Sequence, residues 1–130
     1  MKQPLSIVGA AFLILMAPVA ISTVSPVVQF HDLVAGQGGG GFADGEFHSV
    51  QFNHPCGVAL NAEGTILYIA DRENHRLRAV ALEDRNQVTT VAGIGKPGLK
   101  DGPAAAATFN QPQALALLPD GRIAVYDAGN

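Results

Sequence analysis

The chain has 130 residues, the length of one ordinary domain, and its eight Lys and Arg against eleven Asp and Glu give a formal net charge of −3. Recognition of DNA or RNA requires clustered Lys and Arg, so this mildly acidic balance argues against a nucleic-acid partner. The single cysteine excludes an internal disulfide, so the core must be held by packing.

The first segment, residues 1–22, is an apolar run behind one positive charge. Leu5–Ile21 is almost wholly apolar and follows Lys2, and the small residues Ala20 and Ser22 fit a secretory signal that is cleaved after Ser22. An uncleaved signal anchor is an alternative, because about 17–25 apolar residues span a bilayer, and a buried core helix is a third. In the first two cases residues 1–22 form a hydrophobic helix, and the rest of the chain is extracytoplasmic, either secreted or membrane-anchored. The chain then contacts a membrane only through residues 1–22.

Residues 23–33 are interpreted as a linker with an N-terminal strand, which we expect near Val27–Ala35. From residue 34 onward the chain repeats itself with copies 57 positions apart, as from Phe52 to Phe109. The matching pieces are Val34-Ala35-Gly36 with Val91-Ala92-Gly93, Asp44-Gly45 with Asp101-Gly102, Phe52-Asn53 with Phe109-Asn110, and, one position out of step, Asp71 with Asp127 and Asn74 with Asn130. A repeat at this period is typical of an architecture in which each unit buries its faces against its neighbours.

Each unit is predicted to be a small antiparallel sheet, because short pieces rich in β-branched and aromatic residues alternate with turn residues. The strands expected in the first unit are Gly57–Asn61, Ile66–Asp71, Arg76–Leu82 and Val88–Ala92. The second of them is apolar without interruption up to its final aspartate, so both of its faces should be covered. Tight turns follow the first strand of each unit, with Gly64 and Gly121 at the positions that need a positive φ.

Four short strands recurring at a fixed period indicate a β-propeller. The residues that carry a family resemblance are Val34-Ala35-Gly36, Asp44-Gly45, Phe52-Asn53, Tyr68-Ile69-Ala70-Asp71 and Asn74-His75-Arg76-Leu77. Together they resemble the NHL repeat, although Arg76 stands where the motif's name has its Leu. The resemblance covers residues 34–130 and implies an all-β partial propeller of about one and a half to two four-stranded antiparallel blades. One blade is expected at 52–93 and a partial blade at 109–130, within a larger ring.

Two glycine-rich loops, Gly36–Gly41 and Gly93–Gly98, satisfy the G-x-G-x-x-G spacing of a dinucleotide site. That fingerprint requires a helix directly after it, whose N–H groups meet the pyrophosphate. Here an Asp-Gly pair follows each loop, and the loops recur at the repeat period. We interpret them as connections between sheets and predict no cofactor.

Asp71 and Asp127 end matching strands and precede polar turns. A metal ligand or a general base is one interpretation, but Asp and Asn at such positions favour hydrogen bonds to the N–H groups of the following turn. We therefore predict structural caps at Asp71, Asn74 and Asp127, with a loss of about 1 kcal/mol when Asp71 is truncated.

The histidines His31, His48, His54 and His75 follow no metal-ligand spacing, so we expect them in surface turns. Arg72, Arg76, Arg78 and Arg85 alternate with acidic residues and are expected to form a solvated face with ion pairs. Arg72, His54 and His75 are the candidates for a surface interaction, because function on repeat scaffolds lies in the loops. Cys56 is expected to be buried and inert; the alternative is pairing with a cysteine outside this sequence.

The residues therefore predict no catalytic, metal or cofactor site. The predicted function is an extracytoplasmic scaffold that presents loops to a protein, peptide or glycan ligand. The alternative is a metal-dependent extracytoplasmic propeller enzyme, a lyase or hydrolase, since some propellers similar to this one act on modified peptides with a central metal.

The apolar run after Lys2 predicts that expression in a secreting host places the chain outside the cytosol, because such a run is read by the export machinery. Intact-mass measurement then separates the two forms. Loss of residues 1–22 indicates cleavage, and retention of the full mass in the membrane fraction indicates an anchor. A full-length chain in the soluble cytosolic fraction would contradict both.

Overall fold

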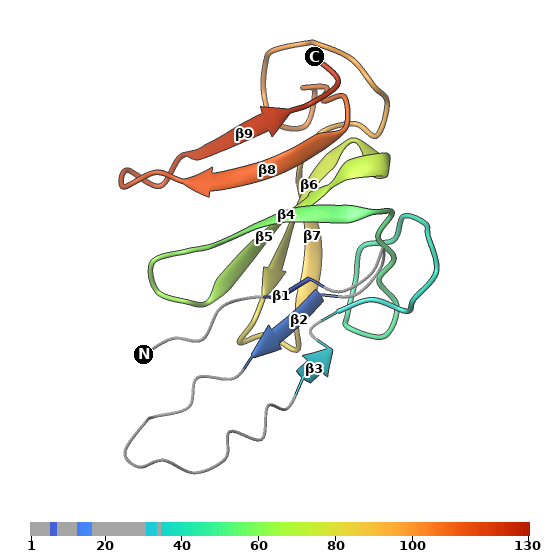
Figure 1. Ribbon diagram of the computed structural model, residues 1–130, viewed down its shortest axis with the longest axis vertical. Helices are drawn as coiled ribbons and strands as arrows, with labels where there is room; N and C mark the ends of the chain where they lie inside the picture. Colours follow the sequence, from blue (N-terminus) through green and yellow to red (C-terminus); the bar gives the residue numbers. More distant parts are fainter. Residues whose placement is uncertain (1–5, 8–12, 17–30, 34) are drawn as a thin grey trace.

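The computed structural model describes residues 6–7, 13–16, 31–33 and 35–130, and its regular elements are strands and one short 3-10 turn (Figure 1). The strands are β1 Ser6–Ile7, β2 Leu13–Met16, β3 His31–Leu33, β4 Pro55–Leu60, β5 Ile66–Asp71, β6 Arg76–Ala81, β7 Gln87–Ala92, β8 Pro112–Leu117 and β9 Ile123–Asp127, and the 3-10 turn η1 is Arg72–Asn74. They form three antiparallel sheets, in the orders β1-β2-β3, β4-β5-β6-β7 and β8-β9.

The strands of the four-stranded sheet lie side by side in the order in which they occur in the chain, because the connections between them are short. Its strands match the four that the sequence predicts, with ends shifted by one or two residues. Cys56 is an extra residue in the pairing of β4 with β5, because the register shifts between Pro55 and Gly57. Such a bulge bends the strand and turns the extra side chain out of the regular alternation.

The core lies on one face of this sheet. Its buried side chains alternate along the inner strands and pair across them: Leu67 lies opposite Val80, which lies opposite Val88. The segment before the sheet covers that face with Val50 and Phe52, which are 0% and 2% exposed. The core is therefore shared between the blade and the loop that leads into it.

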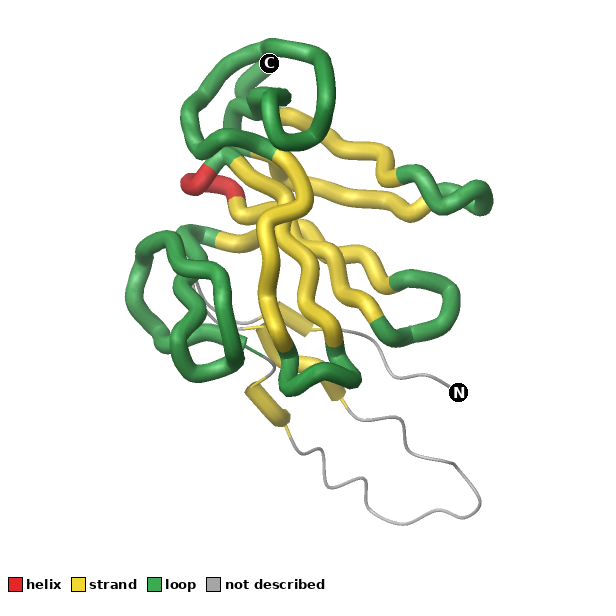
Figure 2. Tube along the Cα trace, turned by 180° about the vertical axis from the view of Figure 1, so that it is seen from behind, coloured by secondary structure: helices red, strands yellow, loops and turns green. Residues whose placement is uncertain are grey.

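The β8-β9 pair repeats the first two strands of the four-stranded sheet. In the β8-β9 hairpin the first residue pair is Pro112 with Asp127, and in the β4-β5 hairpin it is Pro55 with Asp71. In both hairpins the register then shifts by one residue. Figure 1 shows this hairpin stacked on the side of the four-stranded sheet away from β1-β3, and Figure 2 shows the same stacking from behind. Two sheets in succession along the chain thus face each other, as blades of a propeller do.

The two sheets approach each other closely at Gly57. A Cβ on this residue would lie 2.4 Å from the carbonyl oxygen of Gln113 and 2.8 Å from the Cα of Ala114, which is the matching residue of β8. Both contacts are with backbone, so a side chain here would force the sheets apart. Glycine is required at Gly57 because of this contact between blades.

The prediction of a hydrophobic helix within residues 1–22 is wrong for the part that the structure describes, where Ser6–Ile7 and Leu13–Met16 are strands. A continuous apolar run has no period by which helix and strand can be told apart, and here β2 pairs with β3. The remaining residues of this segment, and most of the strand expected near Val27–Ala35, lie outside the described residues. Within the described ranges, no helix has the length and apolar character needed to cross a bilayer.

Replacing Gly57 by Ala is expected to lower the free energy of unfolding by about 1–3 kcal/mol, because overpacking a contact between two backbones forces them to move. The matched control is Gly39→Ala, since nothing lies within 4 Å of a Cβ at Gly39. Urea unfolding of the full chain measures both. Equal stability of the two variants would show that the β4-β8 contact is not tight.

Candidate functional site

The most highly connected polar group of the described chain is the guanidinium of Arg78, in the middle of β6. Its side chain is 0% exposed, so the prediction of a solvated arginine face is wrong for Arg78, although Arg72 and Arg85 are exposed in part and form ion pairs. Nε donates to Asp44 Oδ1 at 2.9 Å, Nη1 donates to Asp71 Oδ2 at 2.7 Å and to the carbonyl of Gln51 at 3.1 Å, and Nη2 donates to the carbonyl of Ala43 at 2.6 Å. Every nitrogen of the guanidinium therefore has an acceptor, as a buried arginine requires.

Asp44 extends this network to the outer strand of the sheet. One carboxylate oxygen lies 2.7 Å from Nη2 of Arg78, and the other accepts from the backbone N–H and the hydroxyl of Thr90. The repeated Asp-Gly pair of the sequence thus supplies a carboxylate that joins the glycine-rich loop to β6 and β7. The matching loop at Gly93–Gly98 lies in the connection between β7 and β8, and no helix follows it in the described residues up to Pro112.

Asp71 supplies the second carboxylate that accepts from Arg78, and it is also 0% exposed. Its Oδ1 accepts from the backbone N–H of Asn53 at 2.7 Å, and its Oδ2 accepts from Nδ2 of Asn74 at 2.8 Å. Burial raises the pKa of Asp71 above its usual value, although these hydrogen bonds and the charge of Arg78 act in the opposite direction.

The sequence predicted that Asp71 accepts from backbone N–H groups of the turn that follows it, and this detail is wrong. From η1 the carboxylate accepts only from the side chain of Asn74, and the backbone N–H that it accepts from belongs to Asn53, which precedes β4. Asp127 has the matching arrangement, since its carboxylate accepts from the N–H of Asn110 at 2.7 Å and from Asn130 at 2.6 Å. Each aspartate therefore fastens the start of its hairpin to the end of the same hairpin.

Gly64 and Gly121 lie in the turns at the opposite end of the two hairpins, and their φ angles of 75° and 86° are ones that glycine adopts without strain. The two turns border a hollow of about 660 Å³, which is one candidate for a ligand groove. Its lining is Leu60, Asn61, Ala62, Glu63, Tyr68, Leu117, Leu118, Pro119, Asp120 and Gly121.

The predicted interaction residues Arg72, His54 and His75 lie at the end of the sheet that carries η1. Arg72 opens η1, its side chain is 36% exposed, and it forms an ion pair of 3.5 Å with Glu73. Its Nε, the atom of that ion pair, is buried and makes no hydrogen bond to a described residue. Nη1 and Nη2 also donate to no described residue, so these two groups are the donors left for a ligand.

The two histidines differ in their surroundings. His54 is exposed, and its Nδ1 lies 3.0 Å from the side-chain oxygen of Asn53. His75 is half-buried, and its Nδ1 accepts from the backbone N–H of Gln111 at 3.1 Å, which leaves Nε2 as the donor of the ring. His75 thus links η1 of one sheet to the start of the next sheet. His54 and Gln111, which match in the repeat, both adopt left-handed φ angles, 50° and 57°.

Cys56 is exposed and free, so the expectation of a buried cysteine is wrong, because the bulge turns this side chain outward. Its thiol donates to the carbonyl of Pro112 at 3.5 Å. Partial burial raises the pKa of the Cys56 thiol, and a raised pKa makes the reactive thiolate scarcer.

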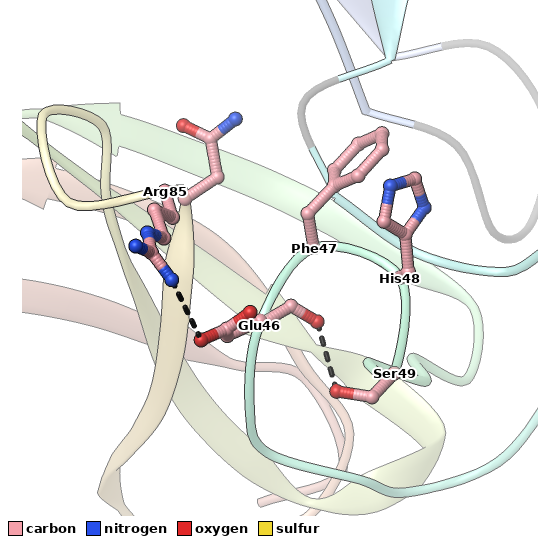
Figure 3. A pocket seen from close by; sticks show the side chains of 6 residues that line it. Glu46, Phe47, His48, Ser49 and Arg85 are labelled. Atoms are coloured by element: carbon pink, nitrogen blue, oxygen red, sulfur yellow. Dashed lines mark hydrogen bonds and ion pairs between the residues drawn. The ribbon is translucent and has the colours of Figure 1, made fainter.

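A second hollow, of about 480 Å³, lies between the loop that precedes the sheet and the turn between β6 and β7 (Figure 3). Figure 3 shows Phe47 and His48 at one side and Arg85 at the other, with Glu46 between them. The pair of Arg85 with Glu46 is 3.7 Å long, and its side chains are 81% and 64% exposed. An ion pair so accessible to solvent is weak, so this hollow offers less fixed geometry than the η1 end.

In the described part of the chain, no group of three or more His, Cys, Asp or Glu side chains is arranged to hold a metal ion.

The fold defines the class of this protein. It is built from antiparallel propeller-type sheets, and the four-stranded sheet and the β8-β9 pair each follow a glycine-rich loop. Residues 52–79 match the model of the NHL repeat, so this chain contains an NHL repeat domain.

Among curated proteins, the chain is 37% identical over 87 residues to Protein SUPPRESSOR OF QUENCHING 1, chloroplastic, of Arabidopsis thaliana, covering 67% of this chain and 8% of that protein. It is 48% identical over 65 residues to NHL repeat-containing protein 2 of Gallus gallus, covering 49% of this chain and 8% of that protein. The chain thus spans 8% of the length of either relative.

Among solved structures, the chain resembles an auxiliary nutrient binding protein from Bacteroides thetaiotaomicron with a TM-score of 0.73 and 22% identity, over 94% of this chain and 31% of that one. A protein of the same description from Bacteroides ovatus matches with a TM-score of 0.66 and 25% identity, over 76% of this chain and 26% of that one. The first likeness concerns the fold alone.

Sequence reasoning missed the role of Arg78. The signal was present, because Asp44 and Asp101 recur at the repeat period and Arg78 is flanked on its strand by apolar residues. A charged residue inside an apolar strand is buried only with a partner, and the recurring aspartate is the partner that the repeat supplies.

Replacing Asp71 by Ala is expected to lower the free energy of unfolding by about 3–5 kcal/mol, because it leaves the buried guanidinium of Arg78 without one of its two carboxylates. This exceeds the loss expected for a turn cap. Chemical unfolding of the full chain gives the value, and Asp120→Ala, which breaks the exposed pair with Arg122, is the control with little expected change. Unchanged stability of the Asp71 variant together with loss of divalent-metal binding would favour the metal-ligand interpretation.

Proposed function

We propose that this protein is an extracytoplasmic NHL-type propeller scaffold, and that it binds a protein, peptide or glycan ligand at the end of the sheets that carries η1. This η1 surface consists of Arg72, Glu73, His75, His54 and Gln111. The observation that carries the proposal is Arg72, whose side chain is 36% exposed and whose Nη1 and Nη2 donate to no described residue.

A binding role fits the chemistry of this surface. An arginine with free donors recognises carboxylates and other oxygen acceptors, and an exposed histidine beside it adds a second donor or acceptor. Protein, peptide and glycan ligands all offer such oxygens. The surface lies on short turns held by a buried network, so little ordering is needed when a ligand arrives.

One solved structure supports a binding role without assigning a ligand. The protein from Bacteroides ovatus, which is 25% identical to this chain, is described as an auxiliary nutrient binding protein. The extracytoplasmic location in the proposal rests on the apolar segment of residues 1–22 alone.

Arg72→Ala is expected to abolish ligand capture or to weaken it by more than about tenfold, because a charge-assisted hydrogen bond contributes about 1.5–3 kcal/mol. The assay exposes the labelled full chain to an array of glycans and peptides and then measures each captured ligand by titration. Arg72→Lys, which keeps the charge and loses the fork of donors, should recover only part of the affinity.

The matched control is Asp120→Asn, which alters the hollow between the hairpin turns and leaves the η1 surface intact. Figure 2 shows η1 and these turns at opposite ends of the sheets. Affinity that survives Arg72→Ala and falls with Asp120→Asn would move the ligand to the hollow between the turns. Absence of capture by the unmodified chain across the array would count against a peptide or glycan scaffold.

A further inference from the structure

Arg76 differs from the other arginines of the described chain, because no carboxylate pairs with it. The other arginines each form an ion pair with an Asp or Glu of this chain; they are Arg72, Arg78, Arg85 and Arg122. Among the described residues, the guanidinium of Arg76 donates one hydrogen bond, from Nη2 to the carbonyl of Ile94 at 3.1 Å. Its Nε and Nη1 have no described partner and are not buried. Most of its N–H donors are therefore available to a ligand.

The position of this guanidinium is fixed by its neighbours. Its Cζ lies over the ring of Phe42, 3.7 Å from the ring centre. Gly95 packs against it from the next loop, since a Cβ on Gly95 would lie 2.5 Å from each of Cζ, Nη1 and Nη2. Equal distances of this size to three atoms of a planar group place that point above the plane. Gly95 therefore lies against a face of the guanidinium, whereas carboxylates bind arginine at its edges.

Two exposed apolar side chains adjoin Arg76. Phe42 and Ile94 are each 43% exposed. Phe42 lies beneath the guanidinium, and Ile94 carries the carbonyl that accepts from it. Phe42, Arg76 and Ile94 together form the Arg76 surface. Aromatic residues and arginine are enriched where proteins bind partners, because together they offer apolar area and directed donors.

The backbone on both sides of Phe42 is fastened to the blade. Before it, the carbonyl of Gly41 accepts from Nδ2 of Asn74 at 2.7 Å. After it, the carbonyl of Ala43 accepts from Nη2 of Arg78 at 2.6 Å. An exposed ring held in this way loses little freedom when a ligand covers it, so the Arg76 surface is organised before binding.

We propose that the Arg76 surface binds an acidic peptide segment, in which a Glu or Asp side chain stands next to a large apolar one. The carboxylate accepts from an edge of the Arg76 guanidinium, and the apolar side chain covers Phe42 or Ile94. The argument for this occupant is charge complementarity, since Arg76 is the one arginine of the described chain that pairs with no described carboxylate. All three residues come from the four-stranded sheet β4-β7 and the loops at its two ends, so the surface is formed within a single repeat.

This site is separate from the one in the proposed function. It includes none of the five residues of the η1 surface, and it would remain if Arg72 bound no ligand. The proposed function fails when no captured ligand depends on Arg72. The inference made here fails when binding of an acidic peptide does not depend on Arg76, so the two failures are distinguishable.

The test is binding of a fluorescein-labelled peptide, Gly-Ser-Glu-Leu-Glu-Phe-Gly-Ser, to the full chain by fluorescence anisotropy. Saturable binding is expected, and it should weaken as the salt concentration rises, because the ion pair is accessible to solvent. The same peptide with Gln in place of both Glu residues keeps the shape and loses the charge, and should bind more than about tenfold more weakly. With Ala in place of Leu and Phe the peptide should also lose affinity, because the contact with Phe42 and Ile94 is lost.

Two variants of one exposed residue test the contact without replacing Arg76. Ile94→Glu places a carboxylate beside the guanidinium, where it pairs with Arg76 and repels the peptide, and should weaken binding by more than about tenfold. Ile94→Gln, the matched control, has the same size without the charge and should weaken binding much less. Arg76→Gln should abolish saturable binding. Arg122→Gln removes an exposed arginine that pairs with Asp120, and should leave binding unchanged.

Equal affinity for the Glu and Gln peptides would show that the contact is apolar only, and the proposal would be wrong. Affinity that falls with Arg72→Ala and survives Arg76→Gln would place the peptide at the η1 surface and overturn the site proposed here. Binding of an oligoglucuronate but not of the peptide would assign the site to a carboxylated glycan and overturn the occupant. No binding of the peptide to the unmodified chain would also overturn the proposal.

Discussion

The structure of this repeat depends on placing one guanidinium, that of Arg78, where no water reaches it. Taking such a charge from water costs several kcal/mol, and the cost is offset only when acceptors surround it with good geometry. Here the acceptors come from the loop at 41–45, from the segment before β4 and from the end of β5. The loop also has backbone hydrogen bonds of its own, from Gly41 to Phe52 and from Gln51 to Ala43. The buried arginine adds to these bonds and joins the loop to β5 and β6.

The same interaction explains why the unit of repetition includes the loop as well as the sheet. Val50 and Phe52 of the loop complete the core of the four-stranded sheet, and Asp44 joins that loop to β6 and β7. Contacts between one blade and the next are made instead at Gly57 and through His75 with Gln111. Stability in such an array is a sum of terms within units and terms between neighbours, and each kind has identifiable residues here.

Much of the fold could be predicted from the sequence, because strand pattern, turn glycines and the repeat all indicate the same sheet. The four strands of the first blade and the recurrence of Asp71 as Asp127 came from these local signals. The apolar residues beside Arg78 and the recurring aspartate are signals of its burial, but its partner Asp44 is remote in sequence, so only the folded chain shows that the two meet. Exposure of Cys56 depends on a one-residue bulge, which no propensity encodes. For the candidate site, Arg72 could be proposed from its place after Asp71, but its unused donors are visible only in the folded chain.

The neighbourhood of Asp71 and Arg72 shows how the buried network and the η1 surface are connected. Asp71 is buried and fixed by Asn53, Asn74 and Arg78, and the next side chain along the backbone reaches the surface. A side chain one residue beyond a buried ion pair has little freedom in its backbone, so Arg72 is presented in a defined direction. Surfaces that are preorganised in this way lose less entropy on binding than flexible loops do. The buried charge thus stabilises the blade and also limits the motion of the surface that we propose to bind ligand.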